Sequence, residues 1–127
     1  MIVVDASVVL DALLAGETAA AASLSPGEPV CAPHLLDVEI AQVLRRLAAA
    51  GALSTKRATE ALEVLGVLPV LRYPHYQLLP RIWELRHSLT AYDAAYVALS
   101  ESLDAVLITR DRRMASAHGH RARVRLV

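Results

Sequence analysis

The chain has 127 residues, 55% of them hydrophobic, and its 13 Lys and Arg residues balance its 13 Asp and Glu residues, so the formal net charge at pH 7 is zero. This length is typical of one domain with one core, and no apolar run approaches the ~20 residues that a membrane helix needs. Since the first basic residue is Arg45 and the single Cys31 excludes an internal disulfide, we expect a cytoplasmic protein without a secretory signal.

Five short runs of β-branched and apolar residues have the length of strands. In chain order they lie at 2–4, around Val30, around Val70, at 105–108 and in VRLV near the C-terminus. Helical patterns cover 7–14, 33–50 closed by Gly51, 54–65, 75–87 and 90–103, with a short helix from Asp111. This alternation predicts a three-layer α/β/α sandwich with a mostly parallel central sheet of about five strands, formed by residues 1–127 as a single domain.

Two aspartates lie at the ends of predicted strands. Asp5 directly follows the first strand, and Asp111 lies three residues after the strand 105–108 in the stretch LITRD. Ligands of open α/β sheets bind outside the carboxyl ends of the strands, so both residues are expected at the edge where a site would form.

Two further acids lie in helices at positions that are unusual for charge. Glu39 belongs to LLDVEIAQVLRRL and falls within the apolar arc of that helix, between Leu35 and Val43, so we expect it to point inward. Asp93 lies in the first turn of a helix whose other residues are nearly all apolar.

Each acid also has an ordinary structural explanation. Asp5 and Asp111 could cap the helices that follow them. Thr90 and Asp93 resemble a capping box with Asp in place of the usual Glu or Gln. Glu39 could reach solvent at the edge of its apolar arc. We favour a shared site because four independent coincidences would otherwise be needed.

A divalent metal would explain such a cluster. Mg²⁺ and Mn²⁺ prefer oxygen ligands and are commonly held by a few carboxylates and substrate phosphates, which removes the repulsion between the acids. These ions can activate water and polarise a phosphoryl oxygen, which is the chemistry of phosphodiester hydrolysis. The hydroxyls of Ser7, Thr90 and Thr109 could orient the carboxylates or the water, or serve only as caps.

The chain resembles a PIN domain, specifically the VapC-type toxin ribonucleases, over essentially its whole length. The resemblance is carried by DAS after the first strand, by the glutamate in LLDVEIAQVLRRL and most specifically by TAYDAAYVALSESLDAVLITRD. It implies a Mg²⁺- or Mn²⁺-dependent endoribonuclease that forms a type II toxin–antitoxin pair with a VapB-type antitoxin, and commonly a homodimer. The matching catalytic and metal-binding acids are Asp5, Glu39, Asp93 and Asp111, and Ser7 and Thr109 match polar positions of the same site.

The C-terminal part of the chain is basic. Six arginines, with His118 and His120, lie between Arg110 and Arg125. Arg110, Arg112 and Arg113 are candidates for contacts with RNA phosphates, and a solvated surface is the alternative. Arg110 could also pair with a neighbouring acid.

Other α/β folds with acids at strand ends fit less well. A receiver domain needs a lysine after a late strand, whereas the only lysine is Lys56, and a haloacid-dehalogenase-type phosphatase needs an aspartate where this chain has Ser7. Neither GxGxxG nor GxxxxGK[ST] occurs. The alternative that stays open is a catalytically inactive regulatory module on the same fold that binds RNA or protein.

The sequence leaves the RNA target and the partner surfaces open. We expect single-stranded or looped RNA to be the substrate, because its bases can be splayed out. Tyr92, next to Asp93, could either stack a base or pack in the core. We expect the apolar faces of Val8–Leu14 and Ala58–Leu65 to bind a partner helix or a second copy.

Overall fold

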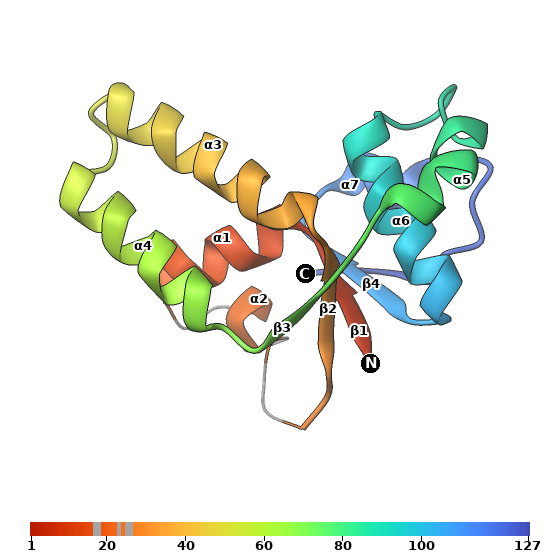
Figure 1. Cartoon of the computed structure of the whole chain (residues 1–127), viewed down its shortest axis with the longest axis horizontal. Helices are drawn as coiled ribbons and strands as arrows, with labels where there is room; N and C mark the ends of the chain where they lie inside the picture. The colour runs from red at the N-terminus through yellow and green to blue at the C-terminus, as the bar shows by residue number, and fades with distance from the viewer. Residues whose placement is uncertain (17–18, 23, 25–26) are drawn as a thin grey trace.

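The structure, a computed structural model, describes residues 1–16, 19–22, 24 and 27–127 (Figure 1). The strands are β1 (Ile2–Val4), β2 (Val30–Pro33), β3 (Val70–Tyr73), β4 (Val106–Thr109) and β5 (Val124–Leu126). The helices are α1 (Ala6–Ala15), α2 (Ala19–Ala22), α3 (Leu35–Ala49), α4 (Thr55–Val67), the 3₁₀ turn η1 (Tyr76–Leu78), α5 (Leu79–Glu84), α6 (Ala91–Leu103) and α7 (Arg112–Ser116). No helix among these residues is both long and apolar enough to cross a membrane.

The strands form one sheet in the order β3-β2-β1-β4-β5, and every pairing in it is parallel. This confirms the predicted parallel sheet of about five strands. β1 lies at its centre, and its three residues are buried. A parallel strand that is covered on both faces needs apolar side chains throughout, and the sequence of β1 is accordingly a continuous apolar run.

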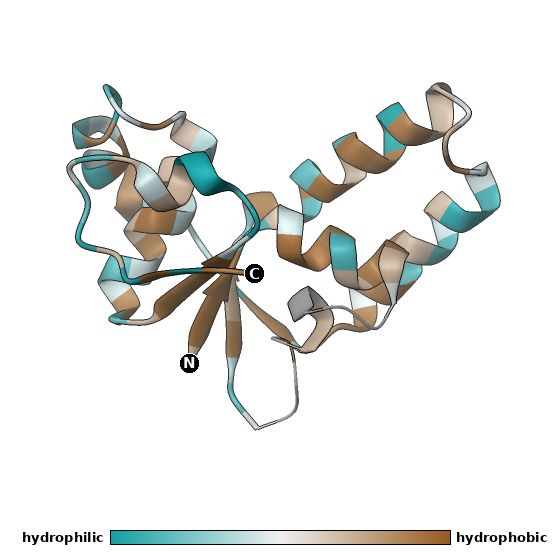
Figure 2. Cartoon of the chain, turned by 180° about the vertical axis from the view of Figure 1, so that it is seen from behind, coloured by the Kyte–Doolittle hydropathy of each residue, from teal (hydrophilic) through white to brown (hydrophobic). Residues whose placement is uncertain are grey.

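Helices cover both faces of the sheet and produce the predicted three layers. α1, α3 and α4 lie on one side, and α5, α6 and α7 lie on the other (Figure 1). α6 packs against β1, β2 and β4, and its residues from Ala94 to Ser100 are all buried. Figure 2 shows the hydrophobic colour concentrated on the central strands, with hydrophobic and hydrophilic residues alternating along α3 and α4.

The topology brings distant parts of the chain to one edge of the sheet. All strands run in the same direction, so the residues that follow β1 and β4 emerge at the same edge. α3 begins there because it follows β2. α6 returns the chain to the amino end of β4, so α6 begins at the carboxyl edge. The start of each of these helices is therefore close to the ends of β1 and β4.

Some predicted boundaries were wrong. The helix expected at 33–50 begins only at Leu35, because Pro33 still pairs with Tyr73 in the sheet. Its end was predicted well: Ala50 is the C-cap and Gly51 follows with a positive φ of 73°, a conformation that glycine adopts readily. The helix expected at 75–87 is divided into η1, α5 and turns, with Pro80 in the first turn of α5.

Candidate functional site

Asp5 is held at the carboxyl end of β1 by several donors. Its side chain is only 4% exposed. Oδ1 accepts hydrogen bonds from the Ser7 hydroxyl at 2.5 Å and from the Val8 backbone N–H at 3.2 Å, so Asp5 caps α1 as the simpler explanation predicted. Oδ2 accepts from the Thr109 hydroxyl at 2.5 Å. Burial raises the pKa of Asp5, and these hydrogen bonds lower it in part.

Asp111 is connected to Asp5 through the end of β4. The Thr109 hydroxyl, which donates to Asp5, also accepts from the Asp111 backbone N–H at 2.9 Å. The Ser7 hydroxyl similarly accepts from the Arg110 backbone N–H at 3.1 Å. The Asp111 carboxylate caps α7 by accepting from the Arg113 N–H at 2.8 Å. Thr109 and Ser7 thus fix the segment that carries Asp111 against the segment that carries Asp5.

Glu39 points from α3 toward α6, as its place in the apolar arc predicted. Its Oε2 accepts a hydrogen bond from the hydroxyl of the buried Tyr96 at 2.7 Å. Burial raises the pKa of Glu39, the Tyr96 hydroxyl lowers it, and the charges of Asp93 and Asp5 raise it further. The pKa of Tyr96 is also raised, first by burial and then by the Glu39 charge.

Asp93 lies in the first turn of α6 and is half-buried. The cap of this helix is the Thr90 hydroxyl, which accepts from the Asp93 backbone N–H at 3.2 Å. Burial raises the pKa of the Asp93 carboxyl and the Thr90 hydroxyl lowers it. The charges of Asp111 and Asp5 raise it again, and Arg113 lowers it. The predicted polar residue Thr90 therefore acts on Asp93 while also capping the helix.

The structure brings the four predicted acids within electrostatic reach of one another, because Asp93 interacts with Asp111 and Asp5, and Glu39 interacts with Asp93 and Asp5. Their oxygens are hard donors of the kind that Mg²⁺ and Mn²⁺ prefer. Within the described residues, no group of three His, Cys, Asp or Glu side chains is arranged to hold a metal ion as it stands. The carboxylates of Asp5, Glu39 and Asp111 instead face donors of the protein itself.

The three candidate arginines differ in their surroundings. Arg110 forms an ion pair with Asp11 at 2.5 Å, which is one of the two roles considered for it. Arg113 is almost fully exposed, and its Nε lies 3.5 Å from Asp111 Oδ1. Arg112 is exposed on the first turn of α7. Contacts of these arginines with RNA stay a prediction.

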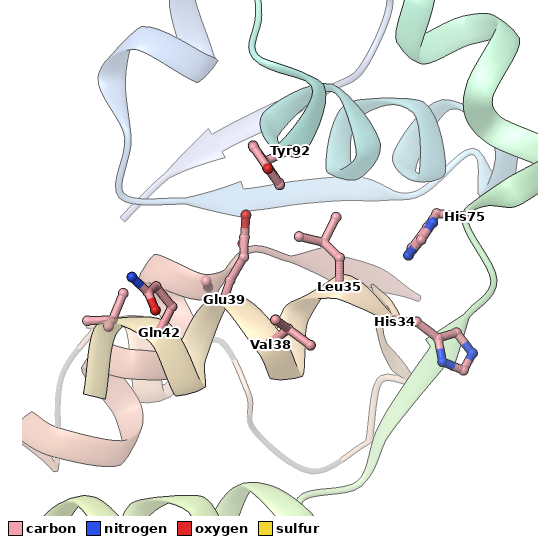
Figure 3. A pocket seen from close by; sticks show the side chains of 9 residues that line it. His34, Leu35, Val38, Glu39, Gln42, His75 and Tyr92 are labelled. Atoms are coloured by element: carbon pink, nitrogen blue, oxygen red, sulfur yellow. The ribbon is translucent and has the colours of Figure 1, made fainter. Parts of the chain in front are cut away.

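A pocket of about 790 Å³ adjoins the acids, and we call it the α3–α6 pocket. Figure 3 shows Glu39 and Leu35 pointing from α3 toward Tyr92, which comes from the start of α6, with His75 at the side. Val38 completes its apolar wall. Glu39 belongs both to the acid cluster and to this pocket, so the two sites adjoin at this residue.

Sequence reasoning missed several residues of this region. Tyr96 follows Asp93 by three residues and so lies on the same helical face, and a hydroxyl in an otherwise apolar run was the signal that could have identified it. Asp11 was given no role but holds Arg110. His75 and Gln42 line the α3–α6 pocket, and no sequence pattern marked either of them.

Comparisons with known proteins agree on one family. Residues 2–119 match the PIN domain model. Ribonuclease VapC9 of Mycobacterium tuberculosis is 48% identical over 114 residues, covering 90% of this chain and 88% of that protein. Ribonuclease VapC1 of the same species is 45% identical over 129 residues, covering 98% and 96%.

A solved toxin–antitoxin complex from Klebsiella pneumoniae contains a chain of the same fold, with a TM-score of 0.66, 20% identity and coverage of 91% of this chain and 92% of that chain. The extent of the family match and the identity to two curated relatives leave one conclusion. This chain belongs to the PIN domain family and, within it, to the VapC ribonucleases.

Proposed function

We propose that this chain is a metal-dependent endoribonuclease that hydrolyses RNA phosphodiester bonds as the toxin of a type II toxin–antitoxin pair. The observation that supports the proposal is the electrostatic coupling among four carboxylates from four separate segments near the carboxyl edge of the sheet. Burial and mutual repulsion raise the pKa of Glu39 and of Asp93 in this cluster, which a divalent cation would relieve. The 127 residues act as one nuclease domain.

Asp5, Glu39, Asp93 and Asp111 would hold Mg²⁺ or Mn²⁺. Bound there, the ion would supply positive charge that polarises a phosphoryl oxygen and activates the attacking water. Glu39 uses Oε2 for Tyr96, which leaves Oε1 as the oxygen directed at a ligand. Asp5 and Asp111 would coordinate the ion while each also accepts a backbone N–H at the start of a helix, because a carboxylate has lone pairs for both.

The surrounding hydroxyls orient these carboxylates. Ser7 and Thr109 each donate to a different oxygen of Asp5, so they fix the plane of its carboxylate. The buried Tyr96 holds one oxygen of Glu39, because its hydroxyl donates to Oε2. Thr90 positions Asp93 because its hydroxyl caps α6 and accepts a hydrogen bond from the Asp93 backbone N–H.

RNA phosphates would meet Arg112 and Arg113, which lie exposed beside Asp111. Arg110 contributes less, because its charge is already paired with Asp11. RNA is chosen over other phosphodiesters because two relatives with 45–48% identity are named ribonucleases. The free, buried Cys31 is compatible with action in the cytoplasm.

A VapB-type antitoxin and a second copy of the chain are the proposed protein partners. The antitoxin proposal draws on the toxin–antitoxin complex of the same fold. On the chain itself, α1 leaves little apolar surface, because Val8 and Val9 are fully buried. α4 offers more, since Leu62, Val64 and Val67 are exposed in the helix. Light scattering of the parent protein and of Val67→Asp would show whether this surface joins two copies.

The test of the nuclease is cleavage of single-stranded RNA by purified protein with Mg²⁺ or Mn²⁺, with EDTA, and after the metal is restored. We expect cleavage only with metal. Asp93→Asn purified in parallel reveals contaminating nuclease, because it should be inactive. RNA binding without cleavage under every metal condition would instead support the inactive regulatory module, and metal-independent cleavage would exclude the proposed chemistry.

A further inference from the structure

The α3–α6 pocket has a chemistry that differs from the acid cluster beside it. Its volume of about 790 Å³ lies within the range of small-molecule sites. The walls are mainly apolar, and no lysine or arginine is among the described residues that line them. The basic side chains of the described lining are the imidazoles of His34 and His75 alone, and the carboxylate of Glu39 would repel a phosphate. The pocket therefore suits an uncharged group with apolar faces.

Tyr92 gives the pocket an aromatic surface that the fold does not use. Its side chain is 65% exposed, so it is not part of the core. Across the pocket, Leu35 and Val38 project from α3, and Val38 is also largely exposed (Figure 3). A flat ring between these two sides would stack on Tyr92 and bury apolar surface against α3.

Polar groups at the rim fit the edge of such a ring. Gln42 offers an amide with both donors and acceptors, and His75 lies at the other side of the pocket. Apolar faces with a polar, hydrogen-bonding edge describe a nucleobase. RNA-binding proteins commonly stack unpaired bases on tyrosine and read their edges with side chains.

The pocket also lies at the correct place for a base of the substrate. Glu39 is shared with the acid cluster, and Asp93 directly follows Tyr92 in the chain. We propose that the α3–α6 pocket seats one unpaired nucleobase of the RNA, stacked on Tyr92 and next to the phosphodiester that is cut. This inference rests on the proposed ribonuclease function and narrows its substrate to RNA whose base at the cut is unstacked.

The experiment is a double-mutant cycle in which one change is made in the protein and the other in the RNA. Tyr92→Leu removes the ring but keeps an apolar side chain, and an abasic nucleotide removes the base beside the mapped cleavage site. We expect each change alone to lower kcat/KM by about tenfold or more, as for other stacked bases. Because both remove the same contact, the two changes together should cost no more than one alone.

The matched control is Tyr76→Leu. Tyr76 is a tyrosine on η1 that is 78% exposed and does not line the α3–α6 pocket, so the same substitution there should leave kcat/KM at the parental value. Tyr92→Phe, which keeps the ring, should restore cleavage to near the parental rate. Unaltered melting temperatures should accompany all three variants, because both tyrosines are exposed.

Two results would overturn the inference while the nuclease stands. One is parental cleavage by Tyr92→Leu of both intact and abasic RNA. The other is full additivity of the two changes at every position flanking the cut. If Tyr92→Leu cuts RNA normally but loses affinity for the antitoxin, the pocket is a protein-docking surface and the inference is wrong.

A second readout does not depend on cleavage. A single-stranded oligoribonucleotide carrying 2-aminopurine loses fluorescence when that base stacks on an aromatic ring. Quenching by the parent protein but not by Tyr92→Leu would support base binding in the pocket. If the same proteins cut no RNA, only the proposed nuclease activity would be contradicted. Equal fluorescence with both proteins, together with no cleavage, would reject both proposals.

Discussion

The two ends of α6 carry acids in opposite electrostatic environments. At its start, burial raises the pKa of Asp93, and the charges of Asp111 and Asp5 raise it further. Near its end, hydrogen bonds from Arg81 lower the pKa of Glu101. Arg81 donates to both Glu101 oxygens, at 2.8 and 3.0 Å, and the Arg121 backbone N–H donates at 2.7 Å.

This difference distinguishes an acid that is paired within the protein, Glu101, from acids that could bind a cation from solution, such as Asp93. The Glu101 side chain is only 8% exposed, but donors of the chain itself compensate it. At the start of α6 the charges of Asp111 and Asp5 raise the pKa of Asp93, and the Thr90 hydroxyl and the charge of Arg113 oppose them in part. Repulsion between these carboxylates lowers the stability of the metal-free fold. A bound cation would remove this repulsion, which would explain why the acids are clustered.

The largest expected effect comes from Asp93→Asn. RNA cleavage should fall by more than about a hundredfold, because even partners of metal ligands cost 10- to 100-fold when changed. The melting temperature of the metal-free variant should equal or exceed that of the parent, because one of the crowded charges is gone. Cleavage kinetics and thermal unfolding in EDTA measure both effects.

Mn²⁺ provides the control for this variant. Metal should raise the melting temperature of the parent more than that of Asp93→Asn, because it binds only the folded protein. A destabilised Asp93→Asn protein that cuts RNA at the parental rate would show that Asp93 only supports the helix.

Glu101→Gln should show the opposite behaviour. The variant loses the charge that Arg81 binds, and hydrogen bonds to charged groups contribute about 1.5–3 kcal/mol, so unfolding free energy should fall by roughly that amount. Cleavage by the folded protein should be unaffected, because Glu101 lies far along α6 from Asp93. Urea unfolding tests the first expectation. A fall in cleavage without a fall in stability would contradict the comparison.

A smaller effect concerns phosphate contacts. Replacing Arg112 and Arg113 with Ala should weaken RNA binding and reduce the slope of log K against log salt by about 0.7 for each lost contact with single-stranded RNA. The control is Arg123→Ala, because Arg123 is exposed but pairs with Asp104 beyond the end of α6. Equal slopes for parent and double variant would assign these arginines to the solvated surface.

The smallest effect is on the pH dependence of stability without metal. The raised pKa of Asp93 means that its protonated form favours the fold, so its contribution is lost as pH rises through that raised value. The lowered pKa of Glu101 acts in reverse, and its contribution is lost as pH falls through the lowered value. Urea unfolding in EDTA from about pH 2 to about pH 8 should show Asp93→Asn flattening the first change and Glu101→Gln the second.

The sequence predicted the framework of the fold because its signals are local. Apolar runs gave all five strands, and the positions of Asp5 and Asp111 relative to β1 and β4 followed from them. The segment 75–87 was predicted less well, because its helical pattern did not show that a proline would start a second short helix. Helix propensity alone does not show where packing in the fold interrupts a helix, as it does between η1 and α5.

Contacts between distant residues were beyond sequence reasoning. The hydrogen bond between Glu39 and the Tyr96 hydroxyl depends on how α3 and α6 face each other, which no local pattern in the sequence reveals. The pairing of Arg110 with Asp11 likewise needs the end of β4 to lie over α1. The roles of the four acids stay predictions that the experiments above would test.

The hydrogen bond between Thr109 and Asp5 joins residues 104 positions apart, and Thr109 in turn lies in a strand whose neighbour is β5. Long-range pairings of parallel strands form slowly, because loop closure precedes the contacts that stabilise it. The four carboxylates therefore cannot meet before the chain has been synthesised past Asp111 and β4 has paired with β1. A fragment that stops before β4 carries Asp5, Glu39 and Asp93 but lacks Thr109 and Asp111, so the acid cluster is assembled late in folding.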